Sequence, residues 1–127
     1  MAYDQPQIEY EISMAATMCV LILRQGLEAG FGCNMPVDES RNNTLLPPAS
    51  GAAREEELLT AMARLRTVMT RSFISFLEEL PVTGGTDILI LSPYDSEAIR
   101  AQMERFSRLG CGTRLLVLSG EEATGVA

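Results

Sequence analysis

Two short and almost entirely apolar runs constrain the fold of this chain more than any other feature. Residues 87–91 read DILIL and residues 115–118 read LLVL. A strand with one face in water alternates apolar and polar residues, whereas a strand buried on both faces is apolar throughout. Both runs are therefore predicted to be strands covered on both faces, as in a parallel sheet flanked by helices.

Helical patterns separate the predicted strands. A further short strand is predicted over 27–33, where Gly30 and Gly32 indicate that a neighbouring backbone approaches closely. The alternation of helices and strands predicts an α/β fold, a three-layer sandwich with a mostly parallel sheet flanked by helices. Apolar residues spaced three and four apart predict helices over 8–23, 58–65, 73–80 and 99–109.

Residues 34–52 contain many Asn, Pro, Ser and Gly residues and show no periodicity, so they are predicted to form a long loop. A loop of this length is usually a functional loop or a lid, and the alternative is a mobile connector without a partner. Loops at the carboxyl ends of strands form the usual recognition surface of an open α/β sheet. The residues predicted to contact a partner are Asn34, Leu45, Leu46, Ser50, Tyr94 and Asp95.

Length and charge restrict the class of protein. A chain of 127 residues fits one domain over 1–127, and residues 120–127 are expected to form a disordered tail. The net charge is −7 and all ten basic residues are Arg, which argues against binding to nucleic acid or to anionic lipid. No apolar run approaches the ~20 residues of a membrane span, so direct membrane insertion is not expected.

The chain has no His, which excludes Ser-His-Asp and Cys-His catalysis and His-based metal ligation. Cys19, Cys33 and Cys111 show no C-x-x-C spacing and indicate a reduced, cytoplasmic protein. Cys33 and Cys111 near strand ends could be reactive, but no neighbouring residue is suited to lower a thiol pKa, and inert Cys is favoured. These absences favour a protein that is not an enzyme and needs no cofactor.

Two other candidate sites have simpler interpretations. Ser50 and Gly51 before a helix could present backbone amides to an anion, but the P-loop Lys and spacing are missing and a plain helix cap is favoured. Asp38, Asp87 and Asp95 could form a carboxylate cluster at one edge of the sheet. Asp95 is more simply a helix N-cap, a role that its neighbour Ser96 could also fill, and Asp87 is a polar residue at a strand entry.

Three stretches together carry a family likeness. They resemble the second part of the bacterial domain-of-unknown-function family 58, a von Willebrand factor A-like group with a Rossmann-like α/β fold. The likeness implies an adaptor or assembly role beside MoxR-type AAA+ ATPases, sometimes as the soluble part of a membrane-anchored protein. The stretches are the helix-to-strand segment 11–34, the segment LPPASG at 46–51 with its following helix, and the strand 88–92 followed by a helix, Gly110 and the strand 115–118.

The chain departs from that family where a metal would bind. Von Willebrand A-like domains begin with a central strand ending in Asp-x-Ser-x-Ser, which this chain is expected to lack as a truncated member; Ser92 and Pro93 also stand where an Asp would follow the later strand. No bound metal is therefore predicted. A missing central strand would leave two neighbouring strands unpaired, which favours a homodimer or a complex with the missing piece.

The predicted function is a non-catalytic protein–protein interaction or assembly domain. The partner would be another protein or a second copy, within an AAA+ ATPase system if the family resemblance holds. The alternative is a Rossmann-like small-ligand or nucleotide-binding enzyme domain, for which the sequence offers no Gly-x-Gly-x-x-Gly fingerprint.

Overall fold

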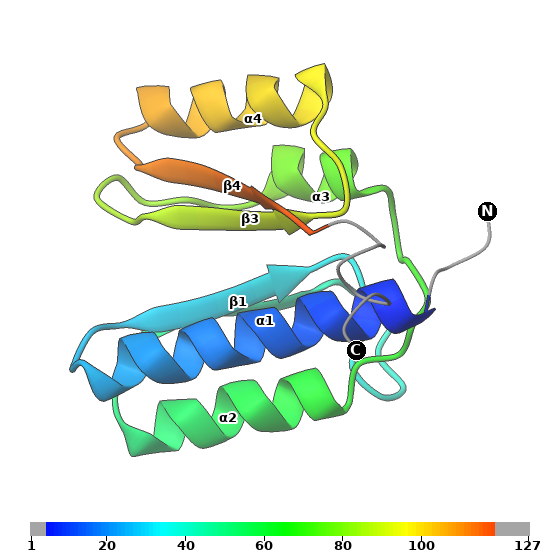
Figure 1. Cartoon of the computed structure of the whole chain (residues 1–127), viewed down its shortest axis with the longest axis vertical. Helices are drawn as coiled ribbons and strands as arrows, with labels where there is room; N and C mark the ends of the chain where they lie inside the picture. Colours follow the sequence, from blue (N-terminus) through cyan, green and yellow to red (C-terminus); the bar gives the residue numbers. More distant parts are fainter. Residues whose placement is uncertain (1–4, 119–127) are drawn as a thin grey trace.

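The computed structural model describes residues 5–118, so the predicted tail over 120–127 lies outside the described residues. This part of the chain contains both helices and strands, which confirms the predicted mixed α/β class (Figure 1). The elements are α1 (Gln5–Arg24), β1 (Ala29–Cys33), β2 (Thr44–Ala49), α2 (Ala52–Ala63), α3 (Phe73–Glu79), β3 (Ile88–Ser92), α4 (Glu97–Arg108) and β4 (Thr113–Val117).

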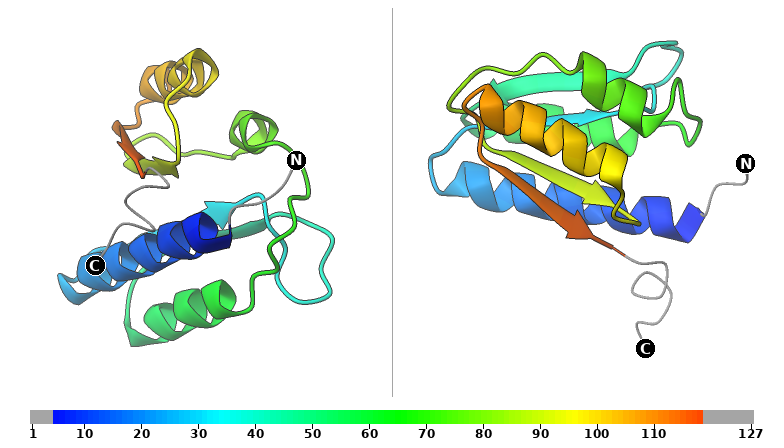
Figure 2. Two further views of the ribbon diagram at one scale, coloured as in Figure 1. Left: turned by 45° about the vertical axis from the view of Figure 1, so that its right-hand side comes forward. Right: turned by 90° about the horizontal axis from the view of Figure 1, so that it is seen from above.

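The strands form two separate two-stranded sheets among the described residues. β1 pairs with β2 in antiparallel orientation, and β3 pairs with β4 in parallel orientation. The views in Figures 1 and 2 agree on the spatial order β4, β3, β1, β2, with no pairing between β3 and β1. The mixed class is therefore confirmed, while a single, mostly parallel sheet in a three-layer sandwich stays a prediction.

The prediction of one long loop over 34–52 is wrong, because Thr44–Ala49 forms β2. This strand could not be recognised in the sequence because it contains Pro47 and Pro48 and lacks the alternation of apolar and polar residues. Proline cannot donate a backbone hydrogen bond and is confined to edge strands, and β2 lies at the edge of its sheet with only β1 beside it. The loop between the two strands is therefore confined to 34–43.

At Gly32 the nearest atoms belong to the side chains of Phe76 and Leu45, so the predicted backbone approach is not found there; at Gly30 it is confirmed. A Cβ atom at this position would lie 2.5 Å from the backbone oxygen of Leu46 and 2.8 Å from the backbone nitrogen of Pro48. The register of β1 and β2 also shifts between Ala29 and Phe31, as in a β-bulge. Glycine is therefore needed here because the β2 backbone fills the space where a side chain would be.

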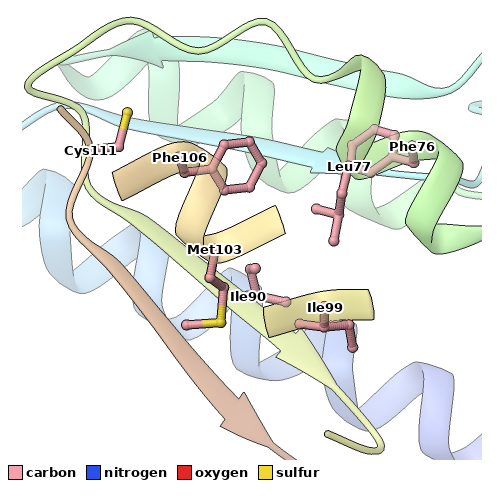
Figure 3. Packing of buried hydrophobic residues seen from close by; sticks show 7 residues of the cluster. All are labelled: Phe76, Leu77, Ile90, Ile99, Met103, Phe106 and Cys111. Atoms are coloured by element: carbon pink, nitrogen blue, oxygen red, sulfur yellow. The ribbon is translucent and has the colours of Figure 1, made fainter. Parts of the chain in front are cut away.

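Each sheet has its own hydrophobic core. The first core lies between β1 and the helices α1 and α2, and the second lies between β3, β4 and the helices α3 and α4 (Figure 3). The first is built from Cys19, Leu23, Ala29, Leu58 and Met62, and the second from Phe76, Leu77, Ile90, Ile99, Met103, Phe106 and Cys111.

Candidate functional site

The six residues predicted to contact a partner do not come together in one place. Asn34 follows the end of β1, and Leu45 stands opposite Gly32 near that same end. Ser50 follows the far end of β2, because Ala49 pairs with the first residue of β1. The antiparallel pairing of β1 and β2 therefore separates Ser50 from the other residues of the predicted surface.

Asn34 is buried and its polar groups are used within the chain. Its side-chain nitrogen donates to the backbone oxygen of Arg71 at 2.9 Å, and its backbone oxygen accepts from the Thr70 N–H at 2.8 Å. These bonds fasten the end of β1 to the segment before α3. Leu46 packs on the first core, whereas Leu45 is exposed.

Tyr94 and Asp95 lie exposed after β3. The helix N-cap is Ser96, whose side chain accepts from the Ile99 N–H, so of the two predicted caps Ser96 is confirmed and Asp95 is wrong. Asp95 instead pairs with Arg100 at 2.7 Å. Hydrogen bonding to Arg100 holds the pKa of the Asp95 carboxyl below its usual range. Both side chains are exposed to water, and an exposed ion pair contributes little energy. The pair is therefore not suited to hold a buried ligand.

The three carboxylates considered as a cluster are not assembled. Asp38 pairs with Arg64 and Asp95 with Arg100, while the side chain of Asp87 lies beside Gly112. Within residues 5–118, no group of three His, Cys, Asp or Glu side chains is placed to hold a metal ion.

The two cysteines near strand ends, Cys33 and Cys111, have surroundings that do not activate a thiol. Burial raises the pKa of the Cys33 thiol to about 11, so this group is a thiol at neutral pH. The Cys111 sulfur is buried and contacts the Thr83 carbonyl oxygen at 3.4 Å. Cys111 belongs to the second core and Cys33 is partly buried outside both cores, and these surroundings agree with the interpretation of both residues as inert.

The most unusual feature of the fold is the seam, which we define as the two facing, unpaired edges of β1 and β3. The two strands run in the same direction on either side of it (Figure 1). Each is paired on its other side only, β1 with β2 and β3 with β4. Strand edges that carry free backbone donors and acceptors can pair with another strand.

The hydrogen bonds of β3 identify the backbone groups that face the seam. The Ile88 N–H donates to the Gly112 oxygen and the Ser92 oxygen accepts from the Leu118 N–H, each at 2.8 Å. In a parallel ladder, alternate residues bond to the same neighbour. Residues 88, 90 and 92 therefore pair with β4, and Leu89 and Leu91 direct their N–H and C=O groups to the seam.

The side chains of β3 show that one face of its sheet is incompletely covered. Ile88 and Ile90 belong to the second core or pack on it, whereas Leu89 is 42% exposed. Leu91 and Leu116 are only partly buried and belong to neither core. The prediction that this strand is covered on both faces is therefore wrong for Leu89.

α1 lies beneath this open face. Its Gln7 side chain donates a hydrogen bond to the carbonyl oxygen of Leu118, the residue after β4. This bond shows which flank of α1 faces the β3–β4 sheet. Helical spacing places Glu11, Met14 and Met18 on that flank, and all three are partly buried. The seam thus has apolar side chains along one side and a single half-buried carboxylate.

Glu11 should carry a cost that a neutral side chain would remove. Burial raises the pKa of the Glu11 carboxyl above 4.5, although a hydrogen bond from Gln7 at 2.6 Å partly opposes this shift. Because the folded pKa is the higher one, the penalty is absent below the unfolded pKa and grows as the pH rises through the folded pKa. We expect Glu11→Gln to raise Tm by about 2 °C at pH 7, after allowance for solvent screening, and by almost nothing near pH 4.

Thermal melts across this pH range check the expectation, with Glu9→Gln as the matched control. Glu9 also accepts a hydrogen bond from a Gln four residues earlier, at 3.2 Å, but this pair is exposed. A gain of equal size in both variants, or one that persists at pH 4, would contradict the assignment of the effect to burial.

Comparison with protein-family models, curated proteins and solved structures finds no match to this chain. The resemblance to the von Willebrand A-like family therefore stays a prediction. None of the helices within residues 5–118 is long and apolar enough to cross a membrane.

Proposed function

We propose that this chain is a non-catalytic protein-binding domain that holds another polypeptide at its open strand edges. The observation that carries the proposal is the seam, where β1 and β3 face each other without pairing. Addition of a strand to an exposed edge is a recurring mode of peptide recognition, in which backbone hydrogen bonds supply affinity and side-chain pockets supply specificity.

The placement of the helices supports the same proposal. α1 and α2 pack on β1 through the face that carries Phe31, whereas the opposite face at Gly32 meets the ring of Phe76 from α3. α3 and α4 also cover one face of β3. The two helix pairs thus lie on opposite sides of the combined strands, and a filled seam would complete a three-layer α/β sandwich.

Peptide display combined with thermal shift tests this function. The purified chain is panned against a library of linear peptides, and the enriched peptides are synthesised and titrated. We expect defined sequences to enrich and to raise Tm, since a ligand at a hundred times its Kd adds about 2.7 kcal/mol to stability. Nucleotides and sugar phosphates are expected to leave Tm unchanged.

A nucleotide or sugar phosphate that raises Tm, in the absence of any enriched peptide, would overturn the proposal in favour of a small-ligand domain. Light scattering across a concentration series examines self-association in the same preparation. A stable dimer would make a second copy the bound polypeptide and would support the assembly form of this function.

A further inference from the structure

Resting on the proposed function, we infer that the seam binds one extended, apolar segment of another polypeptide, inserted between β1 and β3 and parallel to both. The insertion would join two two-stranded sheets into one sheet in the order β2, β1, partner, β3, β4. The occupant is identified by four features of the seam, taken in turn below.

The first feature is the arrangement of the two strands. β1 and β3 lie side by side in Figures 1 and 2, yet no hydrogen-bonded ladder joins them. Contacts outside the strands hold them in place: α1 touches both sheets, and the Phe76 ring lies over Gly32, where an added Cβ would be 2.9 Å from its Cζ atom. The surrounding helices therefore hold the two edges of the seam in place without hydrogen bonds between β1 and β3.

The second feature is the chemistry of the edges. Leu89 and Leu91 direct backbone donors and acceptors to the seam, as the β3–β4 ladder requires. Such groups are satisfied by another extended backbone, and buried backbone groups without a partner are costly. A helix uses its own backbone groups internally, so a strand is the element that fits between these edges.

The third feature is the apolar surface around the seam. Leu89, Leu91 and Leu116 lie on one face of the sheet, and Phe76 and Ile90 lie on the other. A strand inserted here would be covered on both faces, and strands of this kind are rich in Val, Ile and Leu. β1 and β3 each have five residues, so a segment of similar length would span the seam.

The fourth feature concerns the source of the strand. All four strands within residues 5–118 already pair in their own sheets, so none of these strands in a second copy could enter the seam without leaving its own sheet. The outer edge of β2 is also a poor alternative site, because Pro47 and Pro48 remove backbone donors from that strand. A segment of another polypeptide at the seam is therefore favoured over edge-to-edge dimerisation.

The experiment uses the full chain and a synthetic probe. The probe is an acetylated and amidated peptide with a core of five consecutive Val and Ile residues and flanking Lys residues for solubility. Its control carries Pro at the centre of the core, which removes a backbone donor. Binding is measured by titration, and its location by amide hydrogen exchange resolved by residue.

We expect the Val and Ile peptide to slow exchange at Leu89 and Leu91 by at least about tenfold, with slower exchange also along β1. The N–H groups of Ile90 and Leu115 should change less, because the first already pairs with β4 and the second is on the outer edge of β4. The Pro-containing peptide should give no protection.

Three results would overturn the inference. Protection confined to the outer edges of β2 or β4 would leave a protein-binding domain but not this site. Equal protection by the Pro-containing peptide would show adhesion without strand pairing. A chain that is already dimeric, with Leu89 and Leu91 protected before peptide is added, would assign the seam to a second copy. The first and third results leave the proposed function intact, and the second leaves protein binding without the strand edges. The failure of the protein-binding function itself is a small-molecule response without peptide binding.

Discussion

Replacing Phe106 with alanine is expected to lower the free energy of unfolding by about 4 kcal/mol. Phe106 is completely buried in the second core, which also contains Met103 of the same helix and Phe76 and Leu77 of α3 (Figure 3). The shorter side chain would remove apolar burial and leave a cavity between α3, α4 and β3. Because small domains are stable by only about 5–15 kcal/mol, this loss is a large part of the total.

Denaturant unfolding measured by circular dichroism checks this expectation, with Leu109→Ala as the control. Leu109 is 50% exposed just beyond the end of α4, so its truncation should change stability by less than about 0.5 kcal/mol. Similar losses in the two variants would contradict the placement of the core beneath α4.

Gly30→Ala is expected to have the second largest effect, a loss of about 3 kcal/mol. The new Cβ would lie 2.5 Å from the Leu46 oxygen and 2.9 Å from the Pro47 carbonyl carbon. Both atoms belong to the backbone of β2, which cannot move aside by rotating a side chain. The substitution must therefore separate the two strands at the bulge or distort them.

Gly32→Ala provides a matched comparison on the same strand. Its Cβ would meet the far end of the Phe76 ring at 2.9 Å and a methyl carbon of Leu45 at 3.2 Å, and these side chains can shift. We expect a loss of about 1 kcal/mol for this variant. Denaturation midpoints measured side by side decide the point, and a Gly32→Ala loss as large as that of Gly30→Ala would be the contrary result.

The seam distinguishes this chain from a compact α/β domain with one continuous sheet. Two-stranded sheets are marginal by themselves, and here each is stabilised by a helix pair packed on one face. The facing edges keep their capacity for hydrogen bonding, which is why the proposed binding function rests on them and not on the exposed loops.

Several elements follow from local sequence patterns. The three- and four-residue spacing of apolar side chains predicted the helix α1, and the continuous apolar runs predicted β3 and β4. Gly30 also predicted a close backbone approach, because a strand seldom has another reason to lack a side chain. Periodicity and glycine placement are properties of a few neighbouring residues, so they can be read from the sequence without knowing which elements lie side by side.

Tertiary structure alone decided the rest. β2 is a strand because β1 pairs with it, although the local composition around Pro47 favours a loop. Leu89 is exposed because nothing within residues 5–118 completes the sheet beside it, although its apolar neighbours indicate a buried strand. The seam depends on which strands lie next to each other in space. Hydrophobic periodicity indicates which side of an element is buried, but it does not indicate which element lies against that side.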